Sequence, residues 1–229
     1  MIGILIQLLL SYFIVRGVLK ENLSFLGWRP NWQRLTDFFI FLLLAGFCSA
    51  NNFLLRMYFA QEKWVMNPSF NASLLAKGSW YQLKSVLYEE LIFRGALFYL
   101  LIKKLGSKKA LLLSAVAFGI YHWFSYELFN NVGKMVVVFL ITGAAGLLYG
   151  YAYLKTRTLY VPVALHFGWN FVNAFVFSNS NTGPGLLIEK LPPPQVQVSW
   201  LVYAVVSFLP LILFVGLNLL LLWRLKREL

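Results

Sequence analysis

The sequence predicts an all-α protein that crosses a lipid bilayer several times. Of its 229 residues, 60% are hydrophobic and only 12% are charged, a balance typical of integral membrane proteins. Apolar runs of about 20 residues, the length that spans the hydrocarbon core as a helix, recur along the whole chain. Short clusters of Lys and Arg separate these runs, as they do in the loops of multi-span proteins.

Seven stretches have the length and apolarity of membrane-spanning helices. They cover residues 1–19, 36–60, 80–102, 109–124, 132–154, 158–178 and 198–223. The first lacks a basic segment ahead of its apolar core, so we interpret it as a retained helix and not as a signal peptide. An eighth, short or re-entrant segment is left open in 61–79 or 179–197, although Gly and Pro favour a loop in the second stretch.

The remaining organisation is simple. No internal repeat or domain boundary is visible, so we expect one helical membrane domain over residues 1–229. We expect the fourth span to continue through the aromatic run from Ser125 to Phe129, because His122 would otherwise lie near the membrane surface. The small-xxx-small spacing of Gly146 and Gly150 predicts close helix packing.

The distribution of the basic residues favours a membrane protein over a nucleic-acid binder. A formal net charge of +12 would also suit a nucleic-acid binder, but the basic residues are scattered between apolar runs, so we expect a bilayer and no nucleic acid as the partner. Basic residues are more frequent on the side that carries the C-terminus, which predicts a cytoplasmic C-terminus and an external N-terminus. The single cysteine, Cys48, excludes an intrachain disulfide.

Three polar clusters lie within or at the ends of apolar runs. They are Glu89-Glu90-Leu91-Ile92-Phe93-Arg94, Phe118-Gly119-Ile120-Tyr121-His122 and His166-Phe167-Gly168-Trp169-Asn170. An ionisable side chain at membrane depth costs roughly 2.5 to 3.5 kcal/mol on insertion scales, and such residues usually serve chemistry or transport. The clusters therefore mark the candidate functional site, within residues 80–178.

The first cluster contains two glutamates that can serve different purposes. Residues four apart share one face of a helix, so Glu90 can reach Arg94 and form a buried ion pair that supports the site. Adjacent residues point about 100° apart, which lets Glu89 face a cavity instead. A desolvated carboxylate beside an imidazole suits a general base.

The histidines complete a set that can hydrolyse an amide. His122 and His166, the only two in the chain, could converge with Glu89 on one water molecule. Asn170, one turn after His166, offers an amide donor for the oxyanion that forms when a carbonyl becomes tetrahedral. Structural roles are the alternative, because His166 with Asn170 could be an interhelical hydrogen-bond pair and Phe118 could serve the core.

In order and spacing, the three motifs resemble the CPBP family of intramembrane endopeptidases, named for CAAX proteases and bacteriocin-processing enzymes. The family includes the type II CAAX prenyl endopeptidases. The resemblance covers about residues 80 to 178. It implies a substrate that is a membrane-associated protein or peptide, and it leaves open whether that substrate is prenylated.

The resemblance also implies a role for each motif residue. Four would carry the chemistry: Glu89 with His122 polarises the attacking water, and His166 with Asn170 stabilises the oxyanion. Three would support the site: Glu90 and Arg94 brace it, and Phe118 packs against the catalytic helix.

Metal dependence and two other functions stay open. Glu89, His122 and His166 could hold a divalent metal such as zinc with one position free for water, but the His-Glu-x-x-His helix of common zinc proteases is absent, so we favour a metal-independent glutamate mechanism. A non-catalytic scaffold or bacteriocin-immunity protein could use the same fold. A proton-coupled carrier could use the same ionisable residues, although the chain lacks a carrier-like repeat.

Overall fold

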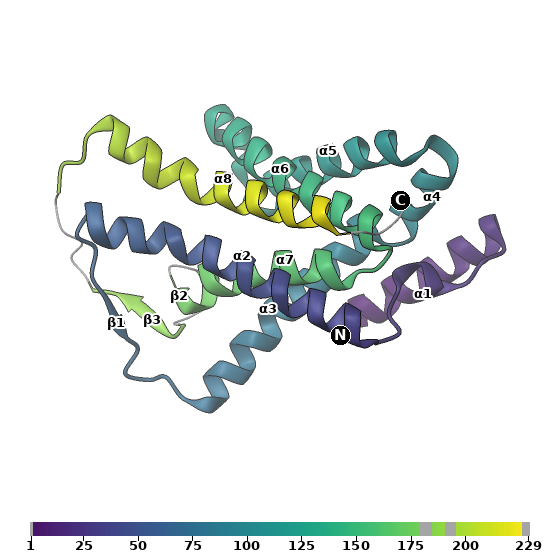
Figure 1. Ribbon diagram of the computed structural model, residues 1–229, viewed down its shortest axis with the longest axis horizontal. Coiled ribbons are helices and arrows are strands. Elements are labelled where there is room, and N and C mark those ends of the chain that lie inside the picture. The colour runs from purple at the N-terminus through teal and green to yellow at the C-terminus, as the bar shows by residue number, and fades with distance from the viewer. Residues whose placement is uncertain (1, 179–184, 191–195, 226–229) are drawn as a thin grey trace. The chain divides into compact units, whose positions relative to one another are not determined.

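The computed structural model describes residues 2–178, 185–190 and 196–225, which are mainly helical (Figure 1). The α-helices in these residues are α1 (Ile2–Leu19), α2 (Trp32–Phe59), α3 (Ala72–Arg94), α4 (Ala96–Leu105), α5 (Ser107–Ser125), α6 (Val132–Thr156), α7 (Tyr160–Phe171) and α8 (Trp200–Arg224). The predicted all-α class is confirmed.

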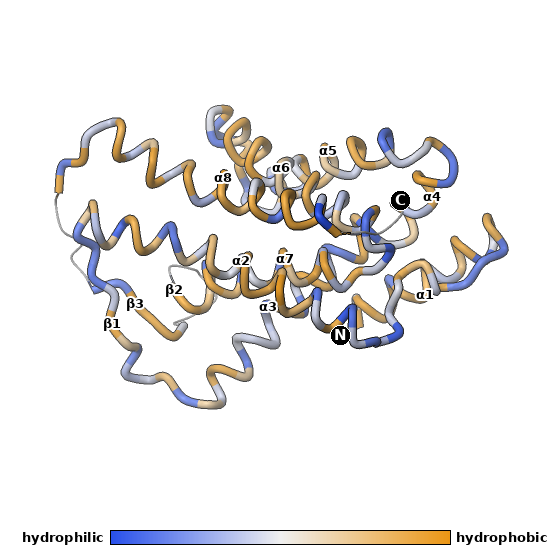
Figure 2. The backbone as a smooth tube through the Cα atoms, viewed as in Figure 1, coloured by the Kyte–Doolittle hydropathy of each residue, from blue (hydrophilic) through white to orange (hydrophobic). Residues whose placement is uncertain are grey.

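Four helices in the described part of the chain are long and apolar enough to cross a membrane: α1, α2, α6 and α8. Figure 2 shows hydrophobic residues along much of their length. Each coincides with a predicted span. The other three predicted spans are also helical but do not reach this standard, and α7 has only 12 residues. The chain is thus an integral membrane protein, and among its described residues four helices, fewer than the seven predicted spans, meet this standard.

The predicted span 80–102 is two helices, because the chain breaks at Gly95. This residue has φ −84° and ψ −142°, outside the helical region, and it separates α3 from α4. A Cβ atom on Gly95 would lie 2.0 Å from the carbonyl oxygen of Leu91, so only glycine permits the break. The chain therefore turns directly after Arg94, the last residue of the first polar motif.

The predicted extension of the fourth span is wrong, because α5 ends at Ser125. Glu127 adopts a left-handed conformation with φ +52°, which a continuing α-helix cannot contain. A 3-10 turn, η2 (Leu128–Asn130), follows. Asn131 then begins α6, since its side chain accepts a hydrogen bond from a backbone N–H in the first turn of that helix. His122 consequently lies in the last turn of α5.

Neither stretch left open for an eighth span forms one in the described residues. Residues 61–79 contain strand β1 (Trp64–Met66) and the start of α3. The described part of 179–197 contains β3 (Leu187–Glu189), which pairs antiparallel with β1 and parallel with β2 (Phe177–Ser178). Residues 179–184 and 191–195, which hold most of the Gly and Pro positions behind the loop prediction, lie outside the described residues.

The chain forms two compact units. The first unit contains Met1–Phe38, Val86–Val163 and Leu219–Leu229, and the second contains Phe39–Ser85 and Ala164–Asn218. Helices α2, α3, α7 and α8 each contribute to both units. The prediction of a single domain stays a prediction.

Close packing of α5 against α6 organises the first unit. A Cβ atom on Gly146 would lie 3.2 Å from the Cα atom of Ala115, and one on Gly150 would lie 2.6 Å from a methyl group of Leu111. The absence of a side chain at Gly146 lets the two backbones approach closely, and at Gly150 it makes room for the Leu111 side chain. The packing role predicted for both glycines is confirmed, and it sets the distance between the helices that carry His122 and Tyr149.

The segment between α1 and α2 is fastened to the same unit. It contains a 3-10 turn, η1 (Leu23–Leu26), followed by Gly27 with φ +63°. The backbone N–H of Leu159 donates to the carbonyl of Leu26 at 3.0 Å, and Thr158 Oγ1 donates to the carbonyl of Gly27 at 3.1 Å. These bonds hold the segment against the turn between α6 and α7.

Helix α7 packs tightly against α2 in the second unit. A Cβ atom on Gly168 would lie 2.4 Å from the carbonyl oxygen of Leu42, so the two backbones touch there. Ser49 Oγ also donates to the carbonyl of Trp169 at 3.1 Å. After Phe171 the chain continues as a π-helix, η3 (Val172–Val176), which leads into β2.

Candidate active site

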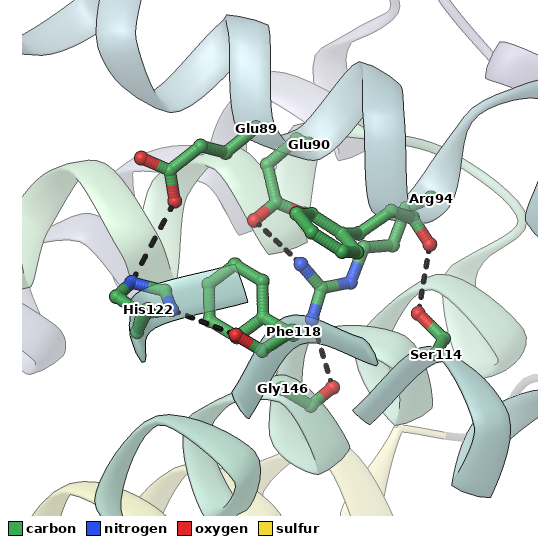
Figure 3. A network of polar contacts seen from close by, with 8 residues as sticks. Glu89, Glu90, Arg94, Ser114, Phe118, His122 and Gly146 are labelled. Carbon is green, nitrogen blue, oxygen red and sulfur yellow. Dashed lines mark hydrogen bonds and ion pairs between the residues drawn. The ribbon is translucent and has the colours of Figure 1, made fainter. Parts of the chain in front are cut away.

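Glu90 and Arg94 form a fully buried ion pair in the first unit (Figure 3). Both side chains are 0% exposed, and Arg94 Nη1 lies 3.1 Å from Glu90 Oε1. This is the pair that their four-residue spacing predicts. Arg94 Nη2 donates a second hydrogen bond to the carbonyl oxygen of Gly146, at 2.9 Å. The guanidinium group therefore joins α3 to the backbone of α6.

Aromatic rings enclose the Arg94 guanidinium group. Its central carbon lies 4.6 Å from the ring centroid of Phe118 and 5.2 Å from that of Tyr149. Aromatic faces attract a cation and replace part of the water that burial removes. Tyr149 lies three residues after Gly146, so both face Arg94 from one side of α6. The contacts of Gly146 and Tyr149 with Arg94 were not predicted. The three-residue spacing of Tyr149 from Gly146 was nevertheless a usable signal, because it places both on one face of α6.

One face of α5 carries the contacts to α3. Ser114, Phe118 and His122 are spaced by four residues and therefore share this face. Ser114 Oγ donates to the carbonyl of Phe93 on α3 at 2.8 Å, and the rings of Phe93 and Phe118 meet edge to face at 5.0 Å. Phe118 thus packs against the helix that holds both glutamates. The contribution of Ser114 was not predicted.

Glu89 faces His122, away from the buried ion pair (Figure 3). Glu89 Oε2 lies 4.0 Å from His122 Nε2. The two side chains are 13% and 9% exposed, so both are nearly enclosed but not sealed. The structure therefore brings together two of the four residues to which the sequence assigns chemistry, from α3 and from the last turn of α5.

The backbone of Phe118 fixes the orientation of the His122 ring. His122 Nδ1 lies 2.7 Å from the carbonyl oxygen of Phe118. A carbonyl oxygen can only accept, so Nδ1 carries the proton of this hydrogen bond. In the neutral ring the nitrogen without a proton is then Nε2, which faces Glu89. The Phe118 ring packs edge to face on the imidazole, with 4.6 Å between ring centroids.

His166 and Asn170 lie on α7, in the second unit. His166 is buried, with 4% exposure, and Asn170 is partly buried. Their four-residue spacing places both on one face of α7, directly before the π-helix η3. Such π segments occur frequently at functional sites. Because Glu89 and His122 belong to the first unit, the convergence of all four residues stays a prediction.

A metal-ligand set is not visible among the described residues. No three His, Cys, Asp or Glu side chains there are grouped closely enough to hold a metal ion. The zinc alternative requires Glu89 and His122 of the first unit together with His166 of the second. It therefore stays a prediction as well.

Comparison with known proteins agrees with the motifs. Residues 71–172 match the family model described as Rce1-like, type II CAAX prenyl endopeptidase, and this stretch contains all three polar clusters. Neither the curated proteins nor the solved structures contain a match. The resemblance inferred from the motifs is confirmed, and residues 71–172 are similar to the CAAX-type family of membrane proteases.

Proposed function

We propose that the protein is an intramembrane endopeptidase in which Glu89 and His122 activate the attacking water. The observation that carries the proposal is the facing pair itself. Glu89 Oε2 and His122 Nε2 are 4.0 Å apart, and because Nδ1 donates to the Phe118 carbonyl, Nε2 is the basic nitrogen of the neutral ring. Two acceptors that face one another in a nearly enclosed site can orient and deprotonate a water molecule.

The distance between the two atoms supports this role. A separation of 4.0 Å exceeds that of a direct hydrogen bond. One water about 2.8 Å from each atom fits between the carboxylate and the imidazole. Such a water would donate one proton to each acceptor and keep a lone pair for attack on a carbonyl carbon.

The reaction then needs a donor for the developing oxyanion. In our proposal, His166 and Asn170 supply it from α7. The water oxygen bonds to the carbonyl carbon, Glu89 takes up the proton that the water loses, and the carbonyl oxygen becomes the oxyanion. When the carbon–nitrogen bond breaks, this proton passes to the departing amine. Removal of one oxyanion donor typically costs about 10²- to 10³-fold in rate.

Glu90 is a poorer candidate for the base. One of its oxygens accepts from Arg94, and its side chain is fully buried. A carboxylate that is fully buried and engaged by a guanidinium group is not placed to contact an attacking water. We therefore assign Glu90 and Arg94 to support of the site, together with Phe118.

The substrate class follows from the family and the setting. We propose a peptide bond in a protein or peptide that a lipid group or an apolar segment holds in the bilayer. Prenylated CAAX-type proteins are one such class, and the name of the matched family points to it. Comparing membrane peptides in cells that contain the active or the inactive protein would identify the natural substrate.

The test is cleavage of a membrane-tethered peptide by Glu89→Gln. The variant keeps the shape of the side chain and loses the base, so we expect cleavage to fall by at least about 10²-fold while the amount of folded protein is unchanged. Glu127→Gln, an exposed glutamate near the end of α5, is the matched control and should cleave normally.

Full cleavage by Glu89→Gln would refute the assignment of the base. Loss of cleavage with unchanged biological activity would favour a scaffold or immunity role. Metal analysis of the purified protein, with activity measured after chelation, decides between the glutamate mechanism and a zinc site at Glu89, His122 and His166.

A further inference from the structure

Two cavities in the first unit meet at Trp28. The basic cavity, about 570 Å³, is lined mainly by the segment between α1 and α2, including Arg29, and by Arg34 in the first turn of α2. The apolar cavity, about 320 Å³, is lined mainly by aliphatic side chains, including Leu8 and Leu91. Trp28 contributes to the walls of both. Each volume is within the range of ligand pockets, roughly 300 to 1,000 Å³.

One face of α1 runs along both cavities. Ile4 and Leu8 line the apolar cavity, and Tyr12 lines the basic one. These three residues are spaced by four, so they form a single stripe that extends about 12 Å along the helix axis. The two cavities are therefore neighbouring parts of one surface, apolar at one end and cationic at the other.

This surface lies on the opposite side of α3 from the candidate active site. Leu87 and Leu91 line the apolar cavity from α3. Glu89 is two residues from each of them, so at 100° per residue its side chain points about 160° away from both. The apolar cavity is thus on the opposite side of α3 from Glu89 and His122. A ligand bound there would contact the catalytic helix without reaching the pair proposed to activate water.

The basic cavity has the charge of an anion site. In the part of the chain that the structure describes, neither Arg29 nor Arg34 forms an ion pair with a carboxylate. Arg34 Nη1 donates to the carbonyl of Arg29 at 2.6 Å, which orients its guanidinium group and leaves other N–H donors available. No acidic residue lines either cavity. Phosphate is the anion that two neighbouring guanidinium groups bind well.

We propose that the two cavities bind one anionic glycerophospholipid of the bilayer. Its phosphate contacts Arg29 and Arg34, one acyl chain enters the apolar cavity, and Trp28 lies at the boundary between them. Indole rings favour this level of a membrane. In the predicted orientation the site faces the cytoplasmic leaflet, where anionic lipids attract basic segments. The proposal does not depend on the proteolytic function.

The test is native mass spectrometry of the purified full chain, titrated separately with phosphatidylglycerol and with phosphatidylcholine of the same acyl chains. We expect phosphatidylglycerol to bind with clear preference. The double variant Arg29→Gln/Arg34→Gln should weaken its binding roughly 30-fold, because each of the two basic contacts near a membrane surface is worth about one kcal/mol. Inorganic phosphate alone should not displace the lipid.

Three further variants test which features of the protein are responsible for lipid binding. Lys108→Gln/Lys109→Gln removes the same charge from the exposed start of α5 and should bind lipid like the wild type. Leu87→Trp fills the apolar cavity and should weaken binding even with both arginines present. Glu89→Gln should bind lipid normally, which separates this proposal from the proteolytic one.

Several results would overturn the proposal. Equal binding of the two lipids, or equal loss in the Arg29/Arg34 and Lys108/Lys109 variants, would show that the arginines attract charge without forming a site. Displacement by free phosphate would show that the basic cavity binds small anions and not specifically a lipid. Displacement by a lipid-modified substrate peptide would assign the cavities to the substrate.

Discussion

Glu89 and Glu90 are adjacent on α3 and have opposite surroundings. Glu90 is sealed from solvent and bonded to Arg94, whose guanidinium group is in turn bonded to the α6 backbone and covered by aromatic rings. Glu89 keeps 13% exposure and faces His122 across 4.0 Å. The difference teaches that two neighbouring residues of a helix can have separate roles, one holding the structure together and the other placed to react.

The two environments imply different consequences when a charge is removed. Breaking a buried ion pair leaves an uncompensated charge, which typically costs 3–5 kcal/mol of stability. Neutralising a partly accessible carboxylate that is 4.0 Å from its partner removes little stabilising energy. The variants below should therefore separate into those that lose activity and those that lose folded protein.

His122→Ala should have the largest effect on activity. It removes one of the two acceptors for the proposed water, so we expect cleavage of a membrane-tethered peptide to fall about 10²- to 10⁴-fold. Folded protein should persist, because the ring has its backbone bond within its own helix. Single-turnover cleavage per folded molecule is the measurement. Near-normal cleavage by this variant would remove His122 from the mechanism.

Arg94→Met should have the largest effect on stability. It leaves Glu90 charged and buried without its guanidinium partner, and we expect a loss of about 3–5 kcal/mol. Thermal unfolding in detergent measures this loss. The control is Arg56→Met, which breaks the more exposed Arg56–Glu62 pair and should cost about 1 kcal/mol or less. Equal losses in both variants would contradict the structural role of Arg94.

Gly146→Ala should be less severe. The new Cβ atom would lie 3.2 Å from Ala115 Cα and 3.2 Å from the Phe118 ring, so α5 and α6 must separate slightly, at about 1–3 kcal/mol. Gly143→Ala, one turn earlier on α6, meets nothing closer than 3.9 Å and should be neutral or stabilising. Unfolding midpoints compare the two. A similar change in the unfolding midpoint of both variants would show that the close contact at Gly146 does not determine the stability of the α5–α6 packing.

The smallest effect concerns the segment before α2 and depends on pH. Hydrogen bonds from Tyr99 and then Lys103 lower the pKa of Glu21 below its usual value. A carboxyl with a lowered folded-state pKa stabilises the protein above its unfolded pKa, and this stabilisation disappears as the pH falls through the folded value. Wild type should therefore exceed Glu21→Gln slightly in unfolding midpoint at neutral pH. The difference should shrink below roughly pH 4, and a constant difference would contradict the assignment.

Local spacing was sufficient to predict much of this site. The Glu90–Arg94 pair follows from positions four apart on a helix, and the separate direction of Glu89 follows from the 100° turn per residue. The order of the three polar motifs along apolar segments was sufficient to predict the resemblance to the CAAX-type protease family. These features need only the helical period and the identity of the side chains.

The rest depends on tertiary contacts that the residue pattern does not encode. Any residue has a backbone carbonyl, so nothing in the sequence singles out that of Gly146 as the acceptor for Arg94. The break at Gly95 was missed because a glycine within an apolar run is usually tolerated in a helix. The end of α5 was misjudged because the position of His122 and the aromatic run after Ser125 both suggested a longer helix, whereas Glu127 turns the chain.

The most direct measurement compares Glu89→Gln with Glu90→Gln in parallel preparations, recording both the cleavage rate per folded molecule and the unfolding midpoint. We predict that Glu89→Gln keeps the wild-type midpoint and loses cleavage. Glu90→Gln should lower the midpoint, while the molecules that remain folded still cleave. The reverse pattern, with activity lost in folded Glu90→Gln and retained in Glu89→Gln, would contradict the account.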